Sequence, residues 1–223
     1  MTKRLLILIC SFAFLATTAQ AGLFKDSVDL ADLSEVSPEA LETLKDSEFE
    51  VFVAHVRLNS AKASERSASG GVKAVNRTLE AENLDMKAAK AESKAAKANQ
   101  DDERMTAATA RIAGAEEDLA TAKALRKWKE QEQEAREVEV SMAKSALDLA
   151  EARRDVARVR LLSQEDAPSV EKYDLSDFES NVAKRQKEHD TASQKAREKI
   201  AKVDKLKADW QRLAKNVDIA ETE

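Results

Sequence analysis

The sequence has little of what a compact globular enzyme is built from. Aromatic residues make up 4% of the 223-residue chain, and it contains only four glycines and two prolines. So few turn-forming residues exclude a β-rich fold, which needs short alternating strands separated by glycine- and proline-marked turns. The thin spread of large apolar residues also argues against a deep globular core.

Reactive and metal-binding residue types are equally scarce. The single cysteine, Cys10, lies in an apolar N-terminal run, so a chain without that run has no disulfide and no thiolate nucleophile. The two histidines, His55 and His189, do not have the spacing of a metal-binding pair. Nucleophile-elbow, phosphate-loop and zinc-protease motifs are absent from the sequence. We therefore expect no enzyme activity, no cofactor and no metal site.

Basic tracts are lacking as well. The formal net charge is −5, and lysine and arginine are interspersed with acidic residues. Nucleic-acid binding needs clustered positive charge, and a lipid-surface helix needs a basic rim beside its apolar face. We expect neither activity. Beyond the N-terminal run no segment is apolar enough to span a bilayer, so we expect no stable membrane insertion once that run is removed.

Residues 1–21 have the features of a secretory signal peptide. Lys3 and Arg4 form a positive region, and residues 5–16 form an apolar run too short to span a bilayer comfortably. Ala19-Gln20-Ala21 is a small-residue cleavage site. Cleavage after Ala21 predicts an exported protein, with the periplasm as its expected location. An uncleaved N-terminal anchor is the alternative.

Helix-forming residues are what the sequence has in abundance, and charged residues alone account for 35%. Residues 22–36 are predicted to be a flexible lead that either packs on the helices or remains loose. Ser37-Pro38-Glu39 predicts the start of a helix over residues 37–69, which the Gly70-Gly71 pair should end. The apolar face of this helix is predicted to contain Leu41, Leu44, Phe49, Phe52, Val53 and Val56.

Residues 72–220 are predicted to form a long helical coiled-coil region, with a weak point at residues 99–103, where Asn and Asp favour caps. A seven-residue repeat is clearest in its last part. Its a positions are Leu175, Val182, His189, Ala196, Val203, Trp210 and Val217. Its d positions are Phe178, Arg185, Ala192, Lys199, Leu206, Leu213 and Ala220.

A matching stripe before this repeat predicts an all-α, elongated antiparallel hairpin of residues 115–163 with 174–220, joined by a loop at about 164–173. The fold then brings Trp128 near Trp210, Leu149 near His189 and Val156 near Val182. The polar seam residues Arg185, His189 and Lys199 are predicted to set the pairing register. The N-terminal helices either return along the hairpin as a three- or four-helix bundle, extend it, or pair with a second chain.

Arg158, Leu162 and Ser169 have the spacing R-x3-L-x6-S around the hairpin loop, followed by Tyr173-Asp174. Here, over about residues 146–184, the chain resembles the α-helical hairpin tip of periplasmic adaptor (membrane fusion) proteins of tripartite efflux and secretion systems. The resemblance implies that Arg158, Leu162 and Ser169 dock on helices of an outer-membrane channel. The chain departs from that family because it has no pattern for the lipoyl-like β domain that carries the hairpin.

These features together predict a non-enzymatic, exported coiled-coil protein, a structural or protein-binding element of a bacterial cell envelope. Its partner is expected to be a protein, or a second copy, bound through the helices. An adaptor-like accessory subunit that docks on an outer-membrane channel through the hairpin tip is one alternative. A periplasmic holdase chaperone, which needs an exposed apolar patch, is the other.

Overall fold

The computed structural model describes residues 27–220, with side chains described for residues 27–215. The predicted signal peptide, residues 1–21, lies outside the described residues. The long helices are α2 (Lys45–Ala98), α3 (Asp102–Gln164) and α4 (Leu175–Ala220). The short elements are η1 (Asp32–Glu35), α1 (Pro38–Leu41), η2 (Glu42–Leu44) and η3 (Pro168–Lys172). No strand occurs in this range, so the all-α prediction is confirmed.

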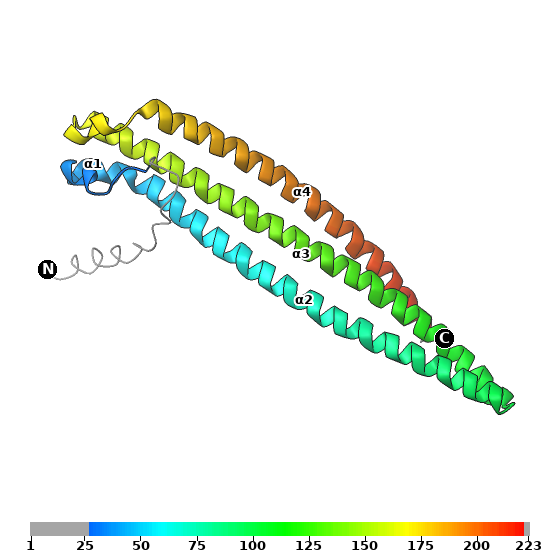
Figure 1. Cartoon of the computed structure of the whole chain (residues 1–223). Coiled ribbons are helices and arrows are strands. Elements are labelled where there is room, and N and C mark those ends of the chain that lie inside the picture. Colours follow the sequence, from blue (N-terminus) through cyan, green and yellow to red (C-terminus); the bar gives the residue numbers. More distant parts are fainter. Residues whose placement is uncertain (1–26, 221–223) are drawn as a thin grey trace, which may run out of the picture.

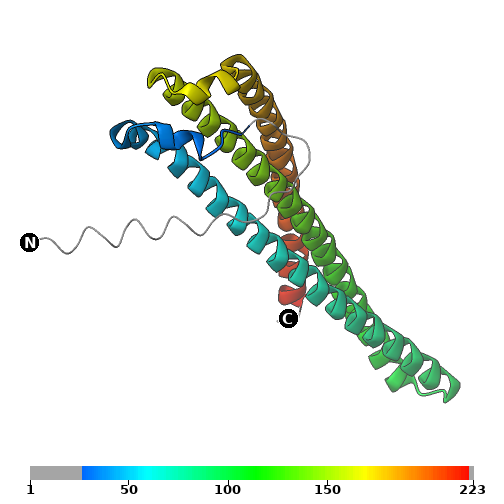
Figure 2. The ribbon, with the colours of Figure 1, turned by 60° about the vertical axis from the view of Figure 1, so that its left-hand side comes forward.

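The three long helices lie side by side, with α3 in the middle (Figure 1). Helix α2 runs antiparallel along one side of α3 and α4 runs antiparallel along another, while the two outer helices make little contact with each other (Figure 2). With 63 residues, α3 is about 95 Å long at 1.5 Å per residue. Of the arrangements left open, the N-terminal helix therefore returns along the hairpin. We call the end with η1, α1 and η3 the capped end, and the turn between α2 and α3 the distal end.

The predicted break at Gly70-Gly71 is wrong, because α2 continues through both residues to Ala98. A glycine in a helix costs only about 1 kcal/mol relative to alanine, which packing on α3 outweighs. The chain reverses instead at residues 99–101, inside the predicted weak point. There Gln100 takes a positive φ of 52°, and the Asp101 side chain accepts a hydrogen bond from the Arg104 amide at 3.0 Å to cap α3.

Two different seams hold α2 on α3. Near the capped end, Val51 and Leu58 of α2 pack with Leu147 of α3. Toward the distal end the seam consists of small residues, which let two helices approach closely but bury little apolar area each. Its buried alanines include Ala89, Ala96, Ala108, Ala115 and Ala122. An ion pair between Arg111 and Glu92, with a 2.7 Å N–O distance, crosses this seam near the distal end.

Along the α3–α4 seam, the residues predicted to lie near each other do so. Trp128 and Trp210 stack with ring centroids 4.9 Å apart and an interplanar angle of 22°. At the other end of the seam, Val182 packs on the apolar cluster that contains Val156. From Leu175 to Trp210 every predicted a and d position of α4 is buried or half-buried, and the seven-residue pattern is confirmed over that range.

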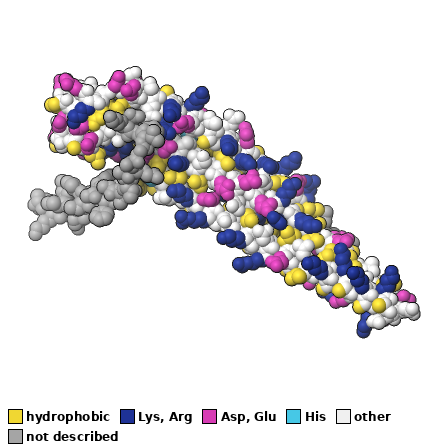
Figure 3. All heavy atoms as spheres, in the orientation of Figure 1, with side chains coloured by type: hydrophobic (Ala, Val, Ile, Leu, Met, Phe, Trp, Pro, Cys, Tyr) yellow, Lys and Arg dark blue, Asp and Glu magenta, His cyan; other side chains and the backbone are white. Residues whose placement is uncertain are grey.

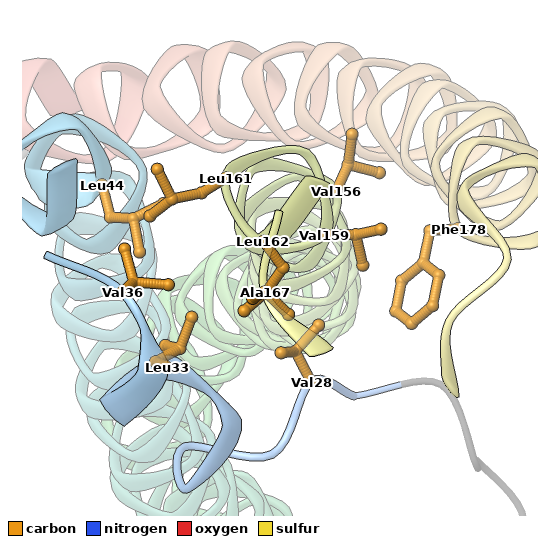
Figure 4. Close-up of a cluster of buried hydrophobic side chains, with 10 residues drawn as sticks. All are labelled: Val28, Leu33, Val36, Leu44, Val156, Val159, Leu161, Leu162, Ala167 and Phe178. Atoms are coloured by element: carbon orange, nitrogen blue, oxygen red, sulfur yellow. The ribbon is translucent and has the colours of Figure 1, made fainter. Parts of the chain in front are cut away.

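A cluster of buried side chains closes the capped end (Figure 4). Its members come from the N-terminal segment, the end of α3, the loop and the start of α4. They are Val28, Leu33, Val36, Leu44, Val156, Val159, Leu161, Leu162, Ala167 and Phe178. Of the two alternatives for the predicted lead, its described part, residues 27–36, packs on the helices and is not a loose segment, because three of its apolar side chains are buried in this cluster. The predicted helix start is confirmed, since Ser37 Oγ accepts from the Ala40 amide at 3.2 Å and Pro38 takes the first helical position.

The continuous course of α2 makes a direct stability prediction. A Cβ added at Gly70 would meet no atom within 4 Å, so Gly70→Ala should raise the free energy of unfolding by about 0.5–1 kcal/mol. The converse change, Ala63→Gly at an exposed position of the same helix, should lower it by a similar amount. Urea unfolding followed by circular dichroism measures both, and a loss of stability in Gly70→Ala would contradict a continuous helix there.

Candidate functional site

The three residues predicted to dock on a channel are buried at the capped end. Leu162 is fully buried in the apolar cluster, and Arg158 and Ser169 are almost as inaccessible. The Ser169 amide donates a hydrogen bond to Glu35 Oε2 at 3.1 Å. The structure thus brings the three together, but as interior residues, and in this conformation they do not form a docking surface.

Arg158 is the centre of a buried charge network between α2 and α3. Its guanidinium donates to Glu48 Oε1 at 2.5 Å and to Asp155 Oδ1 at 3.4 Å, and Arg154 also donates to Asp155, at 3.2 Å. Burial raises the pKa of the Asp155 carboxyl, and the charges of Arg154 and Arg158 offset part of that rise. Burial likewise raises the pKa of the neighbouring Glu151. The network therefore joins the N-terminal half of α2 to the end of α3.

A second polar group, which we call the latch, ties the N-terminal segment to the hairpin loop. Asp32 accepts hydrogen bonds from Lys172 Nζ at 2.7 Å and from the Tyr173 hydroxyl at 2.5 Å. The same hydroxyl accepts from the Asp29 amide at 3.0 Å. Hydrogen bonds from Lys172 and Tyr173 lower the pKa of Asp32, and the bond to Asp32 raises the pKa of Lys172. The latch is thus strongest where Asp32 is ionised and Lys172 is protonated.

Each predicted register residue has a partner on α3. Lys199 pairs with Glu134 at 2.7 Å, and hydrogen bonds from Lys199 and Gln131 lower the pKa of Glu134. His189 Nδ1 lies 3.3 Å from Ser145 Oγ. Arg185 approaches Asp148 at 3.8 Å and pairs with Glu188 of its own helix at 2.9 Å. These contacts give the three side chains a role in α3–α4 pairing, and their control of register stays a prediction.

A shallow polar hollow of about 630 Å³ lies between α3 and α4 around His189. Leu149 forms part of its wall, so the predicted Leu149–His189 level is confirmed. Other lining groups bond one another, since Arg153 donates to Gln186 at 2.8 Å and Gln186 donates to Asp190 at 2.9 Å. The hollow is therefore part of the pairing network.

Within residues 27–220, no set of three or more His, Cys, Asp and Glu side chains is arranged to hold a metal ion. In the same part of the chain, no helix combines the length and apolar character that a bilayer span requires. The surface mixes lysine and arginine with aspartate and glutamate along the visible face of the rod (Figure 3).

The most unusual surface feature is an apolar stripe on α2 that the prediction placed inside. Phe49, Phe52 and Val56 are 64%, 57% and 52% exposed, and the two phenylalanine rings lie 6.4 Å apart. The face of α2 that packs on α3 near them is formed by Val51, Ala54 and Leu58 instead. Both sets have the spacing i, i+3, i+7, and this second stripe was the signal that the sequence reasoning missed. We call Phe49, Phe52 and Val56 the open stripe.

The buried network predicts the effect of removing Arg158. Arg158→Ala leaves the carboxylate of Asp155 buried with less opposing charge, and should lower the free energy of unfolding by about 3 kcal/mol. Arg160→Ala is the matched control, because Arg160 pairs with Glu179 at the exposed surface of the same helix. It should cost less than about 1 kcal/mol. Equal losses in the two variants, measured by urea unfolding, would show that the interior placement of Arg158 is wrong.

The latch predicts that the stability difference between the wild type and a variant without the Asp32 carboxylate depends on pH. Because the pKa of Asp32 is lowered in the folded protein, its carboxylate adds stability above the ordinary aspartate pKa and loses that effect as the pH falls through the lowered value. Asp32→Asn should therefore unfold at lower urea than the wild type at neutral pH, with a gap that narrows in acid. Glu171→Gln, at an exposed position of the hairpin loop next to Lys172, is the control. A gap of equal size at both pH values would contradict the proton linkage.

Comparison with known proteins identifies no relative of this chain. The sequence matches no protein-family model, and no curated protein or solved structure is significantly similar to it. The functional proposals for the chain therefore rest on the contacts, burial and charge of its own residues.

Proposed function

We propose that the chain is a non-enzymatic, exported coiled-coil protein that serves as a structural or protein-binding rod in a bacterial cell envelope. The export part rests on the sequence of residues 1–21, with its positive region, short apolar run and small-residue cleavage site. The rod part is supported by three long helices packed lengthwise, with a spine of 63 residues.

The open stripe is the single observation that carries the binding part of the proposal. Large apolar side chains gathered on one exposed helix face are typical of protein interaction sites, whereas single exposed apolar residues are ordinary. Phe49 and Phe52 are each more than half exposed, because the face of α2 formed by Val51, Ala54 and Leu58 is the one that packs on α3. A partner helix or strand that covers the stripe would remove these rings from water, at about 25 cal/mol per Å² of apolar area.

Two other candidates differ from this proposal, one in the surface that binds and the other in the number of proteins bound. Docking through the hairpin tip would require Arg158, Leu162 and Ser169 to leave their buried positions, so the closed cap disfavours it. A holdase would use the open stripe itself, but for many unfolded clients rather than one partner. The identity and number of the bound proteins therefore separate the candidates.

Photo-crosslinking in the native cell envelope tests these candidates. A photoreactive residue at Phe52 should give one discrete adduct, because the open stripe binds a defined protein. Probes at Glu171, on the exposed loop of the capped end, and at Glu80, exposed farther along α2, are the controls. A discrete adduct from Glu171 alone would favour tip docking, and a ladder of many adducts from Phe52 would favour the holdase. No adduct from Phe52 above the Glu80 level would contradict the proposal.

A further inference from the structure

The open stripe has a charge pattern along one flank. Asp46, Glu50 and Arg57 are exposed, and none of them has an ion-pair partner among the described side chains. At 100° per residue they project within about 40° of one another, on the flank of α2 between the open stripe and the face that packs on α3. The flank is therefore acidic before Phe52 and basic after it.

A second copy of α2 places its basic residue opposite the acidic residues of the first only when the two helices run in opposite directions. Suppose that a second α2 lies antiparallel on the first, with a two-fold axis through Phe52. Residue n of one copy then lies level with residue 104 − n of the other, so Asp46 lies within one residue of the level of Arg57 of the other copy. Phe49 similarly comes within one residue of the level of Val56, and Phe52 meets its own counterpart. A parallel two-fold pair would instead place this flank of the two copies on opposite sides of the interface, where Asp46 and Arg57 do not meet.

We propose that a second copy of this chain covers the open stripe, forming an antiparallel, two-fold symmetric dimer centred on Phe52. This inference rests on the proposed function, in that it identifies the protein that the open stripe binds. A two-fold interface uses the same patch on both copies, which is the arrangement that an apolar centre with reversed flanking charges fits. Pairing through the open stripe leaves the α2–α3 seam in place, because Val51, Ala54 and Leu58 hold α2 on α3 from the opposite face.

The dimer has a shape that can be measured. Phe52 lies near the capped end of α2, so two antiparallel copies joined there point their distal ends in opposite directions. From Phe52 to the end of α2 is about 70 Å at 1.5 Å per residue, which makes the assembly about 140 Å long. A single rod is about 95 Å long, and a parallel dimer would keep that length. The expected increase in maximum dimension is therefore about 1.5-fold.

Light scattering gives the mass of the purified full chain, and small-angle X-ray scattering gives its maximum dimension. We expect twice the chain mass with the longer dimension. Phe52→Glu should return the chain to a monomer with an unchanged helical circular dichroism signal, because Phe52 is exposed in the single chain. Leu84→Glu is the matched control, since Leu84 is also exposed on α2 but lies outside the stripe, and it should stay dimeric.

Charge reversal tests the direction of pairing. Asp46→Arg should weaken the dimer roughly tenfold, because it turns two symmetric attractions into repulsions. Adding Arg57→Asp in the same chain should restore the affinity, as it re-forms both pairs with reversed sign. A dimer that keeps the single-rod length, or a double variant weaker than the single one, would overturn the antiparallel arrangement.

The experiments distinguish failure of the dimer proposal from failure of the proposed binding function. A purified chain that stays monomeric, while the Phe52 probe captures a different protein in the envelope, would overturn the dimer and leave the binding function in place. A monomeric chain without any Phe52 adduct would overturn both. A dimer whose mass is unchanged by Phe52→Glu would show that the copies meet through another surface.

Discussion

The whole architecture depends on one helix having two buried sides. An ordinary surface helix presents a single apolar stripe, but α3 packs on α2 along one side and on α4 along another. Since the two outer helices make little contact with each other, each is positioned only through α3. The continuity of α3 over 63 residues therefore sets the length of the molecule and the relative placement of its other parts.

The two ends of α3 are lined by side chains of different size, and this divides the rod along its length. Alanines such as Ala108 and Ala115 line the distal part of the α2–α3 seam. There the two helices can approach each other closely, but each residue buries little apolar area. Near the capped end the side chains are larger, and Leu162 is fully enclosed by residues from four segments. The capped end is the closest approximation to a globular core in this chain, and the distal end is a two-helix extension of it.

Buried charge is concentrated where the N-terminal segment meets the hairpin. Taking Arg158 and Asp155 out of water is costly unless their polar atoms are paired, and Glu48 supplies the partner from α2. The latch at Asp32 adds a polar connection on the loop side. These groups tie residues 27–48 to the end of α3 and to the loop, because Glu48 and Asp32 supply partners for Arg158 and Lys172. The apolar residues that remain outside, Phe49 and Phe52, are then available to a partner.

The sequence by itself determined the features that depend on local chemistry and helical spacing. Helix-forming composition predicted the all-α fold, Ser37-Pro38 predicted a helix start, and the seven-residue repeat predicted that Trp128 meets Trp210. Only the tertiary structure decided which apolar stripe of α2 turns inward, because both stripes have the same period and only the surface of α3 distinguishes them. It also decided that Arg158 and Ser169 are interior. Their covering residues, Glu48 and Glu35, lie 110 or more positions away along the chain, and no local pattern specifies a contact over that distance.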